Sequence, residues 1–215
     1  MKYPDESQPI DRSGNVDSVA PSGAIAPPQS PAQNDFRPWQ PTTWPAVPQT
    51  FEPDFYNTME RIFNETIILE VSNVINDINA SSNVGLQHRG HVVGLALLCA
   101  TDALASYAYS NIRAIGKRYI EFINNHFPPA YQPFANDIYK LYRNNLVHSW
   151  NLFEGTMLPG NENIENTSGT ISFGLLNFFD ALKSALTDFL DKLKTDTSFQ
   201  ANVLKRYKKL KSSAR

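Results

Sequence analysis

The segment RNNLVH, residues 143–148, places an arginine and a histidine five positions apart in a strongly helical part of the sequence. A guanidinium group forks onto phosphate oxygens and supplies fixed positive charge where a phosphorus centre gains negative charge. A histidine accepts or donates a proton near neutral pH. Arg143 and His148 therefore have the side chains that a metal-independent phosphate-handling site needs. The alternative is that the segment is a solvated helix face.

The spacing of the two residues limits how such a site can form. At about 100° per residue, Arg143 and His148 lie roughly 140° apart around one straight helix. Arg143 falls beside Trp150 on one flank of the apolar stripe, and His148 falls beside Asn144 on the other. We expect the two side chains to meet where the helix bends, or where two copies of it face each other across a twofold axis and share one cleft.

Two further polar features are candidates for a site. Asp102 lies inside the apolar stretch CATDALASY, and a buried carboxylate needs a partner, for which Arg143, His148 or a backbone cap are available. His88 and His91, in QHRGH, have a spacing that can bind a metal, but no third ligand lies close by in sequence. We interpret that segment as a polar helix start, and we expect no metal and no cofactor.

The composition indicates an N-terminal arm followed by one helical domain. Ten of the fifteen prolines of the 215-residue chain lie in residues 1–50, a segment too poor in large apolar residues to form a core. We predict a disordered Pro-rich arm over 1–50, which could bind a protein partner, and a helical domain over 51–215. The arm does not resemble a signal peptide, and we find no apolar run of about 18 residues. We therefore expect a cytoplasmic protein with no membrane contact.

Apolar periodicity predicts an all-α fold, an up-and-down bundle of four main helices with short additional helices. The second helix is apolar nearly all round, so we expect it to be central, with Cys99 as a buried structural thiol. His126 precedes Pro128 and is typical of a helix C-terminal cap. Residues 154–172 are predicted to form a loop with a short hairpin as an option. The predicted helices cover about 52–80, 90–127 with a break or kink at Gly116, 134–153, 173–194 and 198–211.

The net charge of −2 gives the protein no overall basic field that would attract nucleic acid. Contact with nucleic acid would have to come from a local patch. One such patch is at the C-terminus, and a solvated basic helix end is its simpler interpretation. It contains Lys205, Arg206, Lys208, Lys209, Lys211 and Arg215.

Arg143-Asn144-x-x-x-His148 resembles the R-x4–6-H signature of HEPN domains, in which a polar residue, often Asn, follows the Arg. HEPN domains are small α-helical bundles, and many are metal-independent ribonucleases of toxin–antitoxin, abortive-infection and RNA-guided CRISPR systems. Their sites form between two HEPN units. The resemblance covers roughly residues 52–212, and its specific parts are this motif and the helix order. Trp150 departs from one subclass, the toxins paired with a nucleotidyltransferase, which have Tyr at this position.

This resemblance implies an endoribonuclease that acts as a homodimer on RNA, in a toxin or phage-defence role. Arg143 and His148 would be catalytic, Asn144 would hold RNA or orient His148, and Trp150 or Tyr142 would stack a base. Asp102 fits the acidic residue that the family carries on its second helix. Two alternatives remain: a non-catalytic HEPN-like module that binds RNA or protein, and an unrelated helical scaffold with a polar surface.

Overall fold

The structure, a computed structural model, describes residues 50–80, 90–149, 152 and 155–213. The chain divides into two units, Met1–Pro41 and Thr42–Arg215, and all described residues belong to the second. The predicted Pro-rich arm, residues 1–50, lies outside the described residues except for Thr50.

The first helical run follows the predicted helix over 52–80. It comprises α1 (Pro53–Phe63), the π-helix η1 (Asn64–Leu69) and α2 (Glu70–Ala80). Pro53 occupies the first turn of α1, where a missing N–H costs nothing, and Asn64 and Glu70 keep helical backbone angles. The run is therefore continuous, and it packs against α4 (Gly90–Ala108) and α8 (Leu175–Thr195).

The prediction for the second helix is wrong about where it breaks. α4 ends at Ala108 and α5 (Ile115–His126) begins after a connection over 109–114. Gly116 lies in the first turn of α5, where a Cβ would come within 2.6 Å of the Tyr139 ring. The glycine therefore allows close packing of α5 on the next helical segment, and it does not break the helix.

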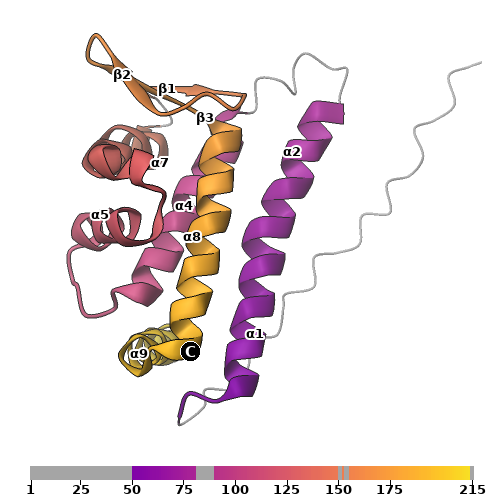
Figure 1. The fold of residues 1–215 in the computed structure, drawn as a ribbon, viewed down its shortest axis with the longest axis vertical. Coiled ribbons are helices and arrows are strands. Elements are labelled where there is room, and N and C mark those ends of the chain that lie inside the picture. The colour runs from indigo at the N-terminus through magenta and orange to yellow at the C-terminus, as the bar shows by residue number, and fades with distance from the viewer. Residues whose placement is uncertain (1–49, 81–89, 150–151, 153–154, 214–215) are drawn as a thin grey trace, which may run out of the picture. The chain divides into compact units, whose positions relative to one another are not determined.

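α4 is central, as predicted, since it contacts α2, α5, α8 and α9 (Thr197–Ser213) (Figure 1). It is not buried all round, because small residues form an exposed stripe along it. Cys99 belongs to this stripe, so the prediction of a buried thiol is wrong. By length and composition α4 could span a membrane, but 56% of its apolar window is buried inside the fold, as in the core helix of a soluble protein. The stripe consists of Val92, Ala96, Cys99 and Ala103.

The predicted third helix, 134–153, is present but irregular. A 3-10 helix η2 (Pro129–Phe134) leads into α6 (Ala135–Asp137), the π-helix η3 (Ile138–Asn144) and α7 (Asn145–Ser149). The backbone at Ile138 and Asn145 stays helical, so these pieces form one continuous run. The predicted helices over 173–194 and 198–211 are confirmed as α8 and α9.

A small sheet shows that the fold is mostly helical and not all-α. β1 (Gly155–Leu158), β2 (Glu165–Thr167) and β3 (Thr170–Gly174) are ordered β1-β3-β2. β2 and β3 form an antiparallel hairpin, and β1 pairs with β3 in parallel. Ser168 and Gly169 have φ values of 55° and 87°, as a tight hairpin turn requires. The optional hairpin is thus confirmed, whereas the parallel strand was not predicted.

Candidate functional site

Asp102, on α4, binds the guanidinium groups of two arginines that come from other elements. Arg143, at the end of η3, places Nη2 2.7 Å from Asp102 Oδ2. Arg118, in the first turn of α5, places Nη2 3.8 Å from Asp102 Oδ1. The side chains of Arg143 and Arg118 are each 15% exposed, and that of Asp102 is 19% exposed. Of the predicted candidate partners for Asp102, which were Arg143, His148 and a backbone cap, the structure shows Arg143.

Aromatic and amide groups hold Arg143 in place. Its guanidinium carbon lies 5.9 Å from the centre of the Tyr139 ring. Its Nη1 donates to Asn144 Oδ1 at 3.2 Å. Burial acts to lower the pKa of Arg143, but the hydrogen bond to Asp102 and the charge of that carboxylate outweigh burial and raise the pKa. Arg143 is thus a fixed cation at the domain surface.

Unsatisfied polar atoms gather at this position. Among the described residues, the buried side-chain nitrogen and oxygen atoms without a hydrogen-bond partner are Asp102 Oδ1, Arg118 Nε, Arg143 Nε and the Tyr119 hydroxyl. Three of these atoms belong to the ion-paired residues. The Tyr119 hydroxyl lies beside Thr101, near Asp102 and Arg143, and burial raises its pKa. We call these four residues the Asp102 cluster. Such atoms are rare in folded proteins, and their concentration in one place makes the Asp102 cluster the candidate functional site.

His148 lies on α7 and is exposed. The π-helix η3 ends at Asn144, so the residues that follow Arg143 turn as an ordinary α-helix and the angle of roughly 140° persists. Arg143 is directed to α4, and within this chain no hydrogen bond joins it to His148. The structure therefore brings Arg143, Asn144 and Asp102 together, and it leaves His148 separate.

The two predicted base-stacking residues differ. Tyr142 is fully buried, with its ring 4.7 Å from that of Phe173. Its hydroxyl donates to the carbonyl of Ile171 and accepts from the amide of Thr156 at 3.2 Å. Tyr142 thus attaches the sheet to the helix that carries Arg143, and in this position it presents no face to a base. Trp150 lies outside the described residues.

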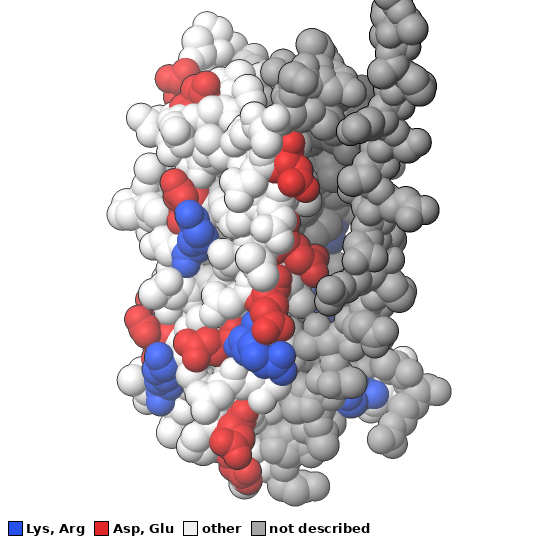
Figure 2. Space-filling model, turned by 90° about the vertical axis from the view of Figure 1, so that its right-hand side faces the viewer, with Lys and Arg blue, Asp and Glu red and all other residues white. Residues whose placement is uncertain are grey.

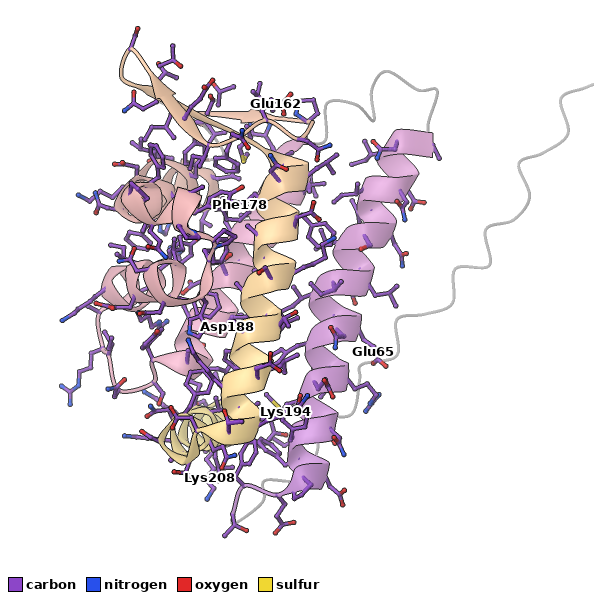
Figure 3. The ribbon with its side chains drawn as sticks, in the orientation of Figure 1. Glu65, Glu162, Phe178, Asp188, Lys194 and Lys208 are labelled. Carbon is purple, nitrogen blue, oxygen red and sulfur yellow. The ribbon has the colours of Figure 1, made fainter. Side chains whose placement is uncertain are left out.

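A second acid-centred cluster lies between α5 and α8. His126 is not a simple helix cap, since its Nδ1 lies 2.6 Å from Asp188 Oδ2, on the side of α8 that faces α5 (Figure 3). Lys192 Nζ donates to the same oxygen at 2.9 Å. Nε2 of His126 lies 3.4 Å from the Tyr109 hydroxyl, so the neutral ring has a partner at each nitrogen. Burial, with the nearby charge of Lys192, lowers the pKa of His126 to about 4.

Sequence reasoning missed two members of the Asp102 cluster, Arg118 and Tyr119. Both lie in KRYIEF, after the helix that carries Asp102, and no local pattern marks this segment as facing that carboxylate. Cys99 also lies close by. Partial enclosure raises the pKa of its thiol, and the charges of Arg143 and Asp102 act on it. Within the described ranges, no three His, Cys, Asp or Glu side chains are grouped as ligands for a metal.

The fold and the cluster define a mostly helical protein with a small three-stranded sheet and an arginine–carboxylate site between helices. A scan against protein-family models and searches of the curated proteins and of the solved structures found no match to the chain.

Proposed function

We propose that the protein is a metal-independent endoribonuclease of HEPN type that cleaves RNA at a site shared between two copies of the chain. The observation that supports it best is the Asp102 cluster. Asp102 fixes Arg143 at the surface while buried polar atoms around it lack partners, and His148 is exposed on the same helical run. Structural ion pairs at helix interfaces rarely leave so many atoms unsatisfied.

The side chains suit transesterification of RNA. His148 accepts the proton of a 2′-hydroxyl, whose oxygen attacks the adjacent phosphorus, and the bond from phosphorus to the 5′-oxygen breaks. Water protonates the leaving 5′-oxygen, and the hydroxide that remains takes the proton from His148. The products are a 2′,3′-cyclic phosphate and a 5′-hydroxyl. Arg143 neutralises the extra negative charge on the phosphorane oxygens, and Asp102 holds Arg143 in the required orientation.

A second copy would supply what one chain lacks. Because Arg143 and His148 point in different directions, a single active site requires the histidine of one copy and the arginine of the other. Cys99, in the exposed stripe of α4, lies near Arg143, and Val92 in the same stripe is 47% exposed, while Val147 on α7 is 38% exposed. Exposed apolar side chains next to a polar site favour a dimer interface there.

We also propose that the four long helical runs form the bundle of a HEPN-like domain and that the protein acts in the cytoplasm as a toxin or in phage defence. The Pro-rich arm would contact a protein partner. These roles follow from the resemblance of RNNLVH to the HEPN signature.

Incubation of the purified chain with single-stranded RNA in EDTA tests the activity. Wild type is expected to produce fragments with cyclic phosphate ends. His148→Ala is expected to lower the rate by about 100-fold or more, as does loss of a general base. His91→Ala, at an exposed histidine on α4, is the matched control and should cut like wild type. Intact RNA at high wild-type concentration, or cleavage by His148→Ala at the wild-type rate, would refute the proposal.

Measurement of the molar mass in solution tests the dimer. Wild type should have twice the chain mass of 24.2 kDa. Val92→Glu places a charge in the α4 stripe and should give the monomer mass. Leu210→Glu, at an exposed leucine of α9, should leave the dimer intact. A monomer mass for wild type would refute a site shared between two copies of the chain.

One observation favours a second candidate, a non-catalytic RNA-binding module. The charge of Arg143 is already compensated by Asp102, and His148 is not oriented by a described hydrogen bond to either residue. In that case wild type binds RNA without cutting it, and His148→Ala leaves binding unchanged.

A further inference from the structure

A basic cavity of about 630 Å³ lies between the α4–α5 connection and α9. Its volume is within the range of roughly 300–1,000 Å³ typical of ligand sites. Every charged side chain that lines it is cationic, and the hydroxyl groups of Ser106 and Ser110 add polar surface. We call it the basic cavity, and its cations are Arg113, Arg118, Lys205, Arg206 and Lys209.

Four of the five cations of the basic cavity are available to an anion. Arg206 Nε donates to Ser106 Oγ at 3.2 Å, and Ser106 donates to the Ala103 carbonyl at 2.8 Å, which fixes the guanidinium against α4. Within the described part of the chain, Arg113, Lys205, Arg206 and Lys209 form no ion pair with a carboxylate. Folding gathers like charges from distant sequence positions, and a bound anion would offset their repulsion.

The start of α5 strengthens the positive field. α5 begins at Ile115, between Arg113 and Arg118, which both line the cavity. Its N-cap residue, Ala114, makes no side-chain capping bond, and its first turn has no acidic residue. The unpaired amide groups and the positive end of the helix dipole therefore add to the charge of the arginines.

Charge is distributed unevenly over the domain, and cations are concentrated in α9, which lines the basic cavity. α9 contains five Lys and Arg residues and no Asp or Glu, whereas residues 52–80 contain six Asp and Glu residues and one Arg. Figure 2 shows the side of α1 and α2, where acidic side chains are scattered over a largely uncharged surface. Glu65 points away from the fold there, whereas Lys208 lies at α9 (Figure 3). Although the net charge is −2, the face formed by α9 is basic and is therefore suited to binding a polyanion.

We propose that the basic cavity binds the phosphodiester backbone of single-stranded RNA and positions the strand so that it extends to the Asp102 cluster. Arg118 belongs to both, because it lines the cavity and lies 3.8 Å from the carboxylate that holds Arg143. A strand seated in the cavity therefore reaches the residue next to the proposed catalytic arginine. The identity of the polyanion rests on the proposed function, whereas the anion site rests on the cavity itself.

Fluorescence anisotropy with a labelled single-stranded 2′-O-methyl RNA tests the cavity apart from cleavage, because this probe has no attacking hydroxyl. The full-length double variant Lys205→Ala/Lys209→Ala removes two cavity charges from exposed helix positions, where alanine preserves the helix. Arg61→Ala/Lys183→Ala removes the same charge from α1 and α8, outside the cavity. Measurement at several salt concentrations gives the number of phosphate contacts.

The cavity variant is expected to bind about tenfold more weakly and to lose about 1.4 from the slope of log affinity against log salt, while the control matches wild type. Three results would overturn the proposal that the cavity binds RNA. They are equal binding by the cavity variant and wild type, equal loss of binding in the cavity and control variants, and no binding by wild type. If wild type does not cut RNA but its RNA binding is weakened in the cavity variant, the cavity site is supported and the nuclease activity is refuted. If wild type cuts RNA and the cavity variant binds RNA as tightly as wild type, the nuclease is supported and the cavity site is refuted.

Discussion

Asp102 and Asp188 each bind two side chains at an interface between helices, but the two clusters leave different groups unsatisfied. Asp188 is 42% exposed, and its partners His126 and Lys192 complete a network in which both ring nitrogens of the histidine are paired. Asp102 is 19% exposed, and its cluster contains every buried side-chain atom without a partner in the described part of the chain.

We interpret this difference as the one between a structural cluster and a candidate functional one. A satisfied network contributes to stability and has no capacity left for a ligand. An unsatisfied one costs stability, and a fold retains it where a substrate completes the contacts. The comparison also separates the histidines, because His126 is enclosed by aromatic rings whereas His148 is open to solvent.

Exchange of each carboxylate for its amide should show the largest contrast. Asp102→Asn removes the charge that orients Arg143, so the cleavage rate should fall by about 100-fold, in the range for lost electrostatic positioning. Asp188→Asn should leave the cleavage rate unchanged and lower the free energy of unfolding by about 1 kcal/mol. Assays of RNA cleavage and urea denaturation on both variants check this. Equal loss of cleavage in both variants would erase the distinction between the clusters.

The pH dependence of stability should report His126. Its pKa is about 4 in the folded protein against 6.5 for the free side chain, so the unfolded chain binds more protons between these pH values. Stability is therefore complete above pH 6.5 and is lost as the pH falls towards 4, by roughly 3 kcal/mol. Urea denaturation of His126→Gln should show a flatter profile over this window, and His91→Gln should keep the wild-type slope. A wild-type slope in His126→Gln would contradict the assignment.

The hydroxyl of Tyr142 should matter for the stability of the sheet. Tyr142→Phe removes the hydrogen bonds to Ile171 and Thr156 and should lower the free energy of unfolding by about 1–2 kcal/mol. Thermal denaturation measures the change. No loss of stability would mean that the sheet is held by other contacts, such as the packing of Phe173.

The smallest effect is expected for the matched variant Tyr119→Phe. The hydroxyl of Tyr119 is buried beside Thr101 without a hydrogen bond of normal geometry, so its removal should leave stability unchanged or raise it by up to about 1 kcal/mol. A clear loss of stability in this variant would show that the Asp102 cluster is satisfied in solution, and it would weaken its interpretation as a ligand site.

Sequence reasoning predicted the helical runs and a partner for Asp102, with Arg143 as one of three candidates, because periodicity marks buried faces and a buried carboxylate needs a partner. It could not locate Arg118, because that contact depends on the turn over 109–114, which brings α5 back beside α4. It also misjudged Cys99, since alanine, valine and cysteine occur both in cores and on exposed stripes. The π-helix η3 could not be predicted, because the pattern of apolar residues does not distinguish it from an α-helix.

The sheet shows the same limit. A hairpin was suggested as an option by the Gly, Asn and Ser content of residues 154–172, but the parallel pairing of β1 with β3 joins segments through tertiary contacts that no local pattern records. The sequence showed only three of the five cations of the basic cavity as a group, those of α9. Arg113 and Arg118 join them through the fold.

Mixed dimers test the shared site most directly. Arg143→Ala and His148→Ala chains are each expected to be inactive alone. When they are mixed in equal amounts and allowed to exchange, about half of the dimers contain one of each, and each such dimer has one intact site. RNA cleavage in EDTA should then recover to roughly a quarter of the wild-type rate. A mixture no more active than the separate variants, beside an active wild type, would contradict a site built from two copies of the chain.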